Sequence, residues 1–179
     1  MKRFLLGFIG LCFLNTLAVG QIYSTNSGTL RFVSEAPLEL IKAESKDLQG
    51  ALNVEKKTFA FKVMIKSFKG FNSPLQQEHF YENYLEAQTF PQAVFTGKVL
   101  ESIKDGNEQY RAKGDLTIHG VTKEVIIDVN LKVAGKTVDF QADFTVALQD
   151  YNIELPRIVY QKIAEVIDVT VQGQLQLRP

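Results

Sequence analysis

The sequence predicts an all-β protein, an antiparallel barrel of about eight strands with one inserted helix. Two observations carry this prediction. Apolar and polar residues alternate strand after strand from residue 121 onward, and a single stretch, residues 75–85, has helical spacing instead. One apolar and one polar face per strand is typical of antiparallel sheets, because parallel sheets are normally covered on both faces. Consecutive hairpins most simply close into a barrel, with a two-sheet sandwich as the alternative.

The second half of the chain contains the clearest strand patterns. Residues 121–133 place apolar side chains at alternate positions, with Ile126 as the exception. Residues 134–136 form a turn, and residues 138–148 and 167–177 repeat the alternation. The polar faces carry charges of both signs, so we expect a solvated exterior. A transmembrane barrel would show the reverse pattern, with apolar residues outward.

The first half predicts shorter strands around one helix. The expected strands are residues 29–34, 38–45, 58–68, 90–103 and, after a turn at 105–107, residues 110–118. The helix is expected over residues 75–85, because Leu75, His79, Phe80 and Tyr84 fall near one face. Ser73 suits the N-cap of this helix, and Pro74 suits its first position.

The N-terminus has the pattern of a secretory signal peptide. Residues 2–3 are basic, residues 4–14 are mostly apolar, and small residues occupy 18–20. The apolar run is too short for a membrane span. We therefore expect cleavage after Gly20, a periplasmic or secreted location, no transmembrane segment in the mature chain, and one β-barrel domain over 21–179.

The composition narrows the function classes. The single cysteine, Cys12, lies in the expected signal peptide, and the residue before it, Leu11, fits poorly with the alternative of a lipoprotein signal. The mature chain would then have no disulfide and would depend on its core for stability. The formal net charge is +0 and the basic residues are dispersed, so nucleic acid is not an expected partner.

Motifs for catalysis or metal binding are absent from the sequence. The only histidines, His79 and His119, are distant from each other, and no nucleophile elbow, phosphate loop or dinucleotide motif occurs. We therefore predict no catalytic residues, metal or cofactor. A histidine in a hairpin turn normally bonds local backbone, so His119→Ala should cost little stability and leave ligand binding near normal. The alternative is an exported hydrolase or isomerase that uses His79 or His119 with a carboxylate.

Aromatic side chains on the apolar faces and around the helix are the candidate ligand-binding residues. Small residues on the same faces (Ala93, Gly97, Ala112, Gly114, Ala142 and Gly173) could leave an elongated cavity, which His79, Phe80 and Tyr84 would bound at one end. A filled barrel that acts by protein interaction remains the alternative. The candidates are Phe59, Phe61, Phe71, His79, Phe80, Tyr84, Phe95, Tyr110, Phe140 and Phe144.

The segment 114–125, GDLTIHGVTKEV, reads as a hairpin with Gly120 in its turn. It closely resembles the G-D-L-T-I-H-G-V-T-K signature of the YceI-like family. Residues 79–97, which carry the helix histidine, Phe90-Pro91 and a following strand, and residues 163–171 resemble the same family. The resemblance implies a lipocalin-like barrel without an established catalytic activity, whose apolar channel holds a polyisoprenoid or quinone tail.

The chain departs from the family pattern near the expected ligand headgroup. Gln76 and Gln77 stand where the family often has arginine and aspartate, and tryptophan is absent. A phosphate headgroup would need a cation, for which Lys66, Lys69 and Arg157 are candidates. The expected partner is an isoprenoid or another long-chain lipid, including a fatty-acid-like one, with burial of the chain as the mechanism. The oligomeric state is left open, with a dimer as one alternative.

Overall fold

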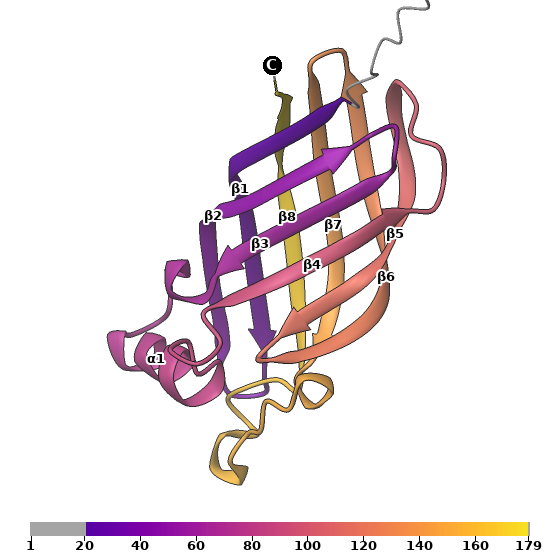
Figure 1. Ribbon diagram of the computed structural model, residues 1–179. Coiled ribbons are helices and arrows are strands. Elements are labelled where there is room, and N and C mark those ends of the chain that lie inside the picture. Colours follow the sequence, from indigo (N-terminus) through magenta and orange to yellow (C-terminus); the bar gives the residue numbers. More distant parts are fainter. Residues whose placement is uncertain (1–20, 179) are drawn as a thin grey trace, which may run out of the picture.

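The computed structural model describes residues 21–178 and shows a closed, antiparallel, eight-stranded barrel (Figure 1). Each strand pairs with the next, and β8 pairs with β1. The predicted fold class is confirmed, and the sandwich alternative is wrong. The expected signal peptide lies outside the described residues. The strands are β1 (Ile22–Glu35), β2 (Leu40–Asn53), β3 (Thr58–Met64), β4 (Gln92–Val99), β5 (Gly106–Ile118), β6 (Val121–Ala134), β7 (Thr137–Ala147) and β8 (Val166–Leu177).

Several strand boundaries differ from the prediction. β1 and β2 are much longer than expected, and Gly106 and Asn107 belong to β5 rather than to a turn. β3 ends at Met64 because a 3₁₀ turn, η1 (Ile65–Ser67), follows it. The Ser67 hydroxyl donates to the Met64 carbonyl at 2.6 Å, which stabilises this turn. The chain therefore leaves the barrel wall before reaching the helix.

The helix begins as predicted but does not continue as a single α-helix. The Ser73 hydroxyl accepts a hydrogen bond from the Gln76 amide at 3.1 Å, and α1 (Pro74–His79) is followed by a π-helical segment, η2 (Phe80–Tyr84). Of the four residues expected near one helix face, Phe80 and Tyr84 line the cavity described below, whereas Leu75 is 59% exposed. An α-helical period does not predict the inward face of a segment that changes to a wider turn.

Short helical turns and a hairpin cover the α1 end of the barrel. The 3₁₀ turns η3 (Leu148–Tyr151) and η4 (Arg157–Val159) lie in the long connection between β7 and β8, beside the β1–β2 hairpin in Figure 1. Among residues 21–178, no helix is long and apolar enough to cross a membrane. The site described below lies under this cover.

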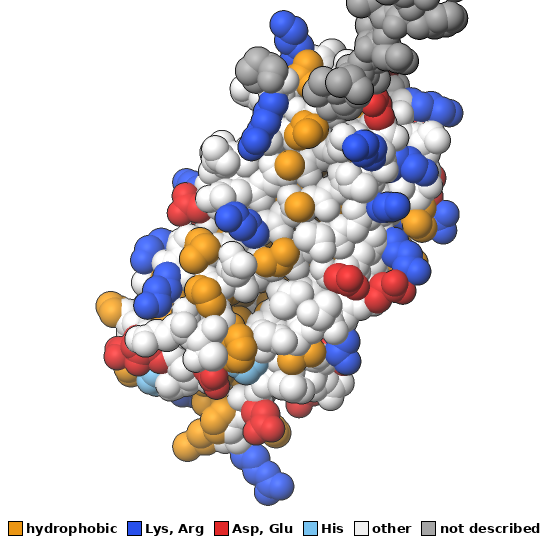
Figure 2. Space-filling view, in the orientation of Figure 1, with side chains coloured by type: hydrophobic (Ala, Val, Ile, Leu, Met, Phe, Trp, Pro, Cys, Tyr) orange, Lys and Arg blue, Asp and Glu red, His pale blue; other side chains and the backbone are white. Residues whose placement is uncertain are grey.

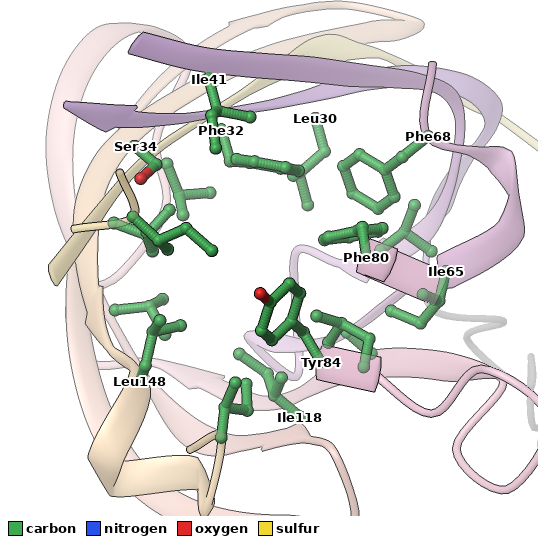
Figure 3. Close-up of a pocket in the computed structure, with 18 of the residues that line it drawn as sticks. Leu30, Phe32, Ser34, Ile41, Ile65, Phe68, Phe80, Tyr84, Ile118 and Leu148 are labelled. Atoms are coloured by element: carbon green, nitrogen blue, oxygen red, sulfur yellow. The ribbon is translucent and has the colours of Figure 1, made fainter. Parts of the chain in front are cut away.

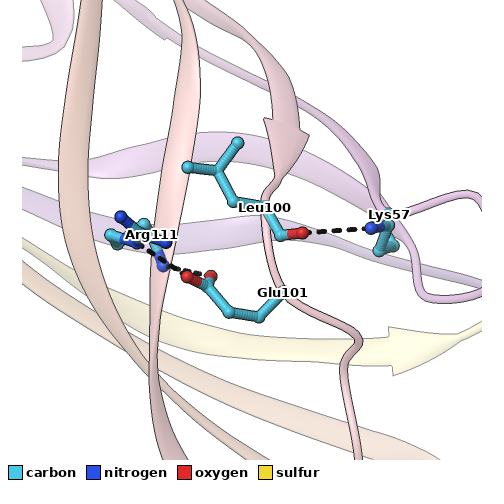
Figure 4. A network of polar contacts seen from close by, with 4 residues as sticks. All are labelled: Lys57, Leu100, Glu101 and Arg111. Carbon is cyan, nitrogen blue, oxygen red and sulfur yellow. Dashed lines mark hydrogen bonds and ion pairs between the residues drawn. The ribbon is translucent and has the colours of Figure 1, made fainter.

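Polar contacts fasten the β4–β5 connection (Figure 4). The Glu101 carboxylate accepts hydrogen bonds from the Arg111 amide at 2.9 Å and from its guanidinium Nε at 2.7 Å, and Lys57 donates to the Leu100 carbonyl at 3.1 Å. The hydrogen bonds from the Arg111 backbone and side chain hold the pKa of Glu101 below its ordinary value. The connection is thereby tied to β5 and to the β2–β3 turn.

Candidate functional site

An apolar cavity of 180 Å³ lies inside the barrel at the α1 end and is partly open to solvent (Figure 3). Its walls combine strand residues with residues from the helical cover. Alternation on the long strands places the strand residues inward. The lining consists of Leu30, Phe32, Ser34, Ile41, Val63, Ile65, Phe68, Phe71, Gln76, Phe80, Tyr84, Leu85, Ala93, Leu116, Ile118, Phe144, Val146, Leu148, Ile153, Leu155, Ile163, Ile167 and Val169.

Only three polar side chains line this cavity, and no charged one does among the described residues. Ser34 is buried, and its hydroxyl already accepts a hydrogen bond from the Ala164 amide at 2.9 Å. Gln76 is also engaged, because its amide nitrogen donates to Glu39 at 2.9 Å. The cavity therefore offers an apolar environment with little spare hydrogen-bonding capacity.

Tyr84 supplies the polar group best placed for a ligand. Its hydroxyl points toward the hollow centre in Figure 3, and within the described part of the chain no hydrogen-bond partner is assigned to it. Burial raises the pKa of this phenol above its ordinary value. The hydroxyl therefore stays protonated near neutral pH and can donate a hydrogen bond to a ligand oxygen.

A second apolar cavity, of 90 Å³, continues deeper into the barrel. Phe144 lines both cavities, and Phe95, which lines the second, is paired across the strands with Leu116, which lines the first. The two cavities are therefore neighbours, and the Phe144 side chain borders both. The second cavity is lined by Leu48, Leu52, Phe59, Phe61, Phe95, Val99, Ala112, Ile127, Val129, Leu131, Phe140, Ala142, Phe144, Val171 and Leu175.

A cluster of phenylalanines joins the helical cover to the barrel wall. The Phe80 ring stacks on Phe32 with centroids 5.3 Å apart, and it contacts Phe71 at 5.0 Å and Phe68 at 5.7 Å. All four rings line the first cavity. The same side chains thus close one wall of the cavity and hold the helix in place.

The structure distributes the predicted ligand-binding residues over these two cavities. The first cavity is lined by Phe71, Phe80 and Tyr84, and Phe144 lines both cavities. The second cavity is lined by four further predicted residues, Phe59, Phe61, Phe95 and Phe140. His79 and Tyr110 line neither cavity. Their assignment to the site remains a prediction that this geometry does not favour.

Tyr110 contributes to the opposite part of the barrel instead. It is 2% exposed, and its hydroxyl accepts a hydrogen bond from the Lys104 amide at 3.1 Å and donates to Glu108 at 3.2 Å. His79 is half-buried on α1. With His119 also outside both cavities, the two histidines are not brought together at either one.

Two groups of lining residues were missed in the sequence. Phe32 and Phe68 lie within predicted strands, so their apolar character was a usable signal. Ile153, Leu155 and Ile163 lie in the β7–β8 connection, which has no regular period. Only the folded arrangement reveals that these three side chains cover the cavity.

The small residues serve two different purposes. Ala93, Ala112 and Ala142 line the cavities, as expected for residues that leave space. Gly97 and Gly114 do not, because they face each other where β4 and β5 approach closely. A Cβ atom on Gly97 would clash with the Lys113 carbonyl oxygen, so the close strand contact requires glycine.

The expectation that His119 bonds local backbone is wrong. Its Nδ1 lies 3.1 Å from the carbonyl oxygen of Tyr151, in η3, and must carry the proton because a carbonyl only accepts. The ring also packs edge-on against Phe90 at 4.8 Å, and its buried Nε2 lies 3.7 Å from a Glu86 carboxylate oxygen. His119 and Gly120 have φ angles of 51° and 73°, as a two-residue hairpin turn of this type requires. The histidine therefore links the β5–β6 turn to the cover.

The candidate cations lie outside the cavities. Lys66, Lys69 and Arg157 line neither one, and the Lys69 ammonium lies 5.7 Å from the centroid of the Tyr81 ring. No group of three histidine, cysteine or acidic side chains within residues 21–178 is arranged to hold a metal ion. The geometry thus favours binding of an uncharged, apolar group.

Solved structures share this fold. A polyisoprenoid-binding domain from Saccharophagus degradans, implicated in plant cell wall breakdown, superposes with a TM-score of 0.75 at 14% identity, covering 89% of this chain and 99% of that chain. BcnA from Burkholderia cenocepacia gives a TM-score of 0.69 at 16% identity, covering 82% and 95%. Identities this low show a common fold alone.

Sequence comparison identifies relatives directly. Protein YceI of Escherichia coli O157:H7 is 33% identical over 78 residues, which is 40% of this chain and 39% of that protein. A UPF0312 protein of Pseudomonas putida strain W619 is 30% identical over 100 residues, or 52% and 50% of the two chains. The matched segments thus span half or less of these relatives. The model of the YceI-like domain matches residues 23–175, almost the entire described barrel, and the chain therefore belongs to the YceI-like family.

Proposed function

We propose that this protein is a non-catalytic carrier that sequesters the apolar chain of an amphiphile inside its barrel. The observation that carries the proposal is the 180 Å³ apolar cavity, partly open to solvent and without a charged lining residue in the described chain. The polyisoprenoid-binding description of the Saccharophagus degradans domain supports a prenyl chain as the ligand. The signal-like N-terminus supports export to the periplasm or the exterior.

Burial of apolar carbon supplies the driving force. Each methylene group removed from water contributes about 0.8 kcal/mol. Ten such groups contribute about 8 kcal/mol, which is within the range of about 4–15 kcal/mol that association costs in lost freedom and ordering. A useful affinity therefore requires a chain of more than about ten buried carbons.

The cavity volume limits how such a chain is bound. A cavity of about 150 Å³ holds a benzene-sized molecule, so 180 Å³ accommodates roughly one isoprene unit. A longer chain must extend past the Phe144 ring, which borders both cavities, into the second cavity of 90 Å³. Binding of a long chain thus couples the two cavities, whereas a short chain occupies only the first.

The polar groups favour a neutral head. Tyr84 donates to an oxygen such as that of a quinone, an alcohol or an amide, and the apolar walls disfavour a buried phosphate without a cation. A phosphorylated lipid would therefore have to keep its head outside the cavity. This reasoning ranks neutral isoprenoids, including quinones, above diphosphates as ligands.

Two measurements test the proposal. Organic extraction and mass spectrometry of the protein purified from its native host should release a neutral long-chain amphiphile at close to one molecule per protein. Tyr84→Phe keeps the ring and removes the hydroxyl, so it should weaken binding of ubiquinone about five- to tenfold, as expected for one hydrogen bond. Binding of an n-alkane should be unchanged, because that ligand has no oxygen. Absence of any extracted lipid, together with no uptake of ubiquinone, would refute the carrier function.

A further inference from the structure

The most exposed large apolar side chain among those described lies in the β7–β8 connection, which also contributes to the cavity wall. Ile158, in η4, is 87% exposed, Tyr160 is 50% exposed, and Leu38 in the β1–β2 hairpin is 67% exposed. We call Leu38, Arg157, Ile158, Tyr160 and Lys162 the docking tip. Figure 2 shows hydrophobic side chains, an acidic one beside them and a basic one that projects at this end of the molecule. Exposure of large apolar side chains at one place marks an interaction surface.

Hydrogen bonds make the tip continuous with the cavity rim. The Leu38 amide donates to the Gln161 carbonyl at 2.8 Å, which joins the β1–β2 hairpin to the loop that carries Ile158. The Ala164 amide donates to the Ser34 hydroxyl, and both Ser34 and the adjacent Ile163 line the cavity. The loop and the hairpin that carry the tip therefore also form part of the cavity wall.

The chemistry of the tip fits a lipid bilayer. Residues 156–164 carry two cations, Arg157 and Lys162, and no acidic residue. The flanking acids are Glu154 and Glu165 beside this loop and Glu35 and Glu39 in the β1–β2 hairpin, where Glu39 accepts a hydrogen bond from Gln76. An apolar side chain beside an exposed tyrosine and flanking cations is the composition of interfacial membrane anchors. The long basic side chains can reach lipid headgroups while Ile158 and Tyr160 enter the interface.

We propose that the docking tip binds the bilayer surface and places the cavity opening against the membrane, so that the chain passes between bilayer and barrel without crossing water. The role in exchange rests on the carrier function proposed above, whereas membrane binding by the tip does not. A protein partner would use the same apolar side chains but would not respond to lipid charge. The response to anionic lipid therefore distinguishes the two.

The test measures sedimentation of the purified protein with vesicles of phosphatidylcholine, with and without phosphatidylglycerol. The double variant Ile158→Ser/Tyr160→Ser should lose binding by roughly tenfold or more, because its apolar contact is gone. Arg157→Gln/Lys162→Gln should lose about fivefold per charge on the anionic vesicles only. Ile126→Ser is the matched control, since Ile126 is 57% exposed on β6, away from the tip.

Uptake of geranylgeraniol, measured without vesicles, separates docking from cargo binding. None of the tip side chains lines the cavity, so the tip variants should take up this prenyl alcohol as the wild type does. Their rate of uptake from vesicles should fall with their vesicle binding. The proposal is overturned if the wild type binds neither vesicle type, or if the Ile158→Ser/Tyr160→Ser variant binds as well as the wild type. Tip-dependent vesicle binding without any uptake of the alcohol would leave docking intact and refute the carrier function.

Discussion

Filling the first cavity with protein atoms should abolish binding while leaving the barrel folded. Ala93 on β4 lines this cavity and pairs with Val63 on β3. Ala93→Leu adds three carbons, and the space left by a leucine-to-alanine truncation is on the order of 150 Å³, close to the 180 Å³ present. Burial of three carbons contributes about 2.4 kcal/mol, and overpacking costs about 1–3 kcal/mol. The free energy of unfolding should therefore stay within about 2 kcal/mol of the wild type.

The assay compares stability and ligand response in the same variant. Urea unfolding of lipid-free protein gives the first quantity, and the rise in Tm with geranylgeraniol gives the second. Ligand at a hundredfold excess over Kd stabilises by about 2.7 kcal/mol, which corresponds to a rise of roughly 5–11 °C for a domain of this size. Ala93→Leu should remove most of that rise. Ala60→Leu, on the exposed face of β3, is the matched control and should keep it.

A folded Ala93→Leu protein that retains the full rise in Tm would refute the placement of the ligand in the first cavity. Ala112→Leu gives a second, independent result, because Ala112 lines only the second cavity. That variant should weaken binding of geranylgeraniol more than binding of a shorter prenyl alcohol such as farnesol. Equal effects on both ligands would contradict the inference that only the longer chain extends from the first cavity into the second.

Three further predictions concern single contacts. Phe144→Ala should merge the cavities, lower the free energy of unfolding by about 3 kcal/mol, and raise the affinity for longer prenyl alcohols relative to shorter ones; an unchanged length preference in a binding titration would contradict this. His119→Ala should lower the free energy of unfolding, measured by urea unfolding, by about 1–3 kcal/mol, because the Tyr151 carbonyl loses its partner. His119→Asn is the control: asparagine tolerates the positive φ angle, so this variant shows the effect of losing the ring without added backbone strain. Glu101→Gln should be less stable than the wild type at neutral pH, with the difference vanishing in acid, because a carboxylate whose pKa is lowered by Arg111 stabilises the fold above its unfolded pKa and loses that effect as pH falls through the lowered value. A difference that persists in acid would assign the effect to something other than ionisation.

The barrel itself was predictable because each strand repeats a period of two. The alternation of residues 121–133 and 167–177 is reproduced in β6 and β8, and Gly120 takes the positive φ angle that the turn requires. The local sequence pattern was sufficient for these strands, because the apolar residues on one face of a strand determine which face is buried. The same pattern placed most of the candidate phenylalanines in the barrel interior.

The cavity and its cover were not predictable in the same way. Ile153 and Ile163 lie in an irregular connection, so no repeating sequence pattern predicts that they face the cavity. His119 bonds a carbonyl 32 residues away, and this contact exists only because the β5–β6 turn and the β7–β8 connection meet at the same end of the barrel. Whether aromatic side chains fill a barrel or leave it hollow depends on small differences in packed volume, which sequence periodicity does not record.

The molecule consists of a barrel wall of paired strands and a cover that is held by side-chain and loop contacts. This division separates the stability of the barrel from the rate at which the cover opens. The barrel wall has continuous strand pairing, whereas the cover is held at its edge by contacts such as Leu38 to Gln161, Ala164 to Ser34, and Gln76 to Glu39. Opening of the cover needs only local unfolding, whose free energy is lower than that of unfolding the barrel. Substitutions at these edge contacts should therefore change the residence time of the cargo, and the amide exchange of the cover, without lowering the melting temperature of the barrel.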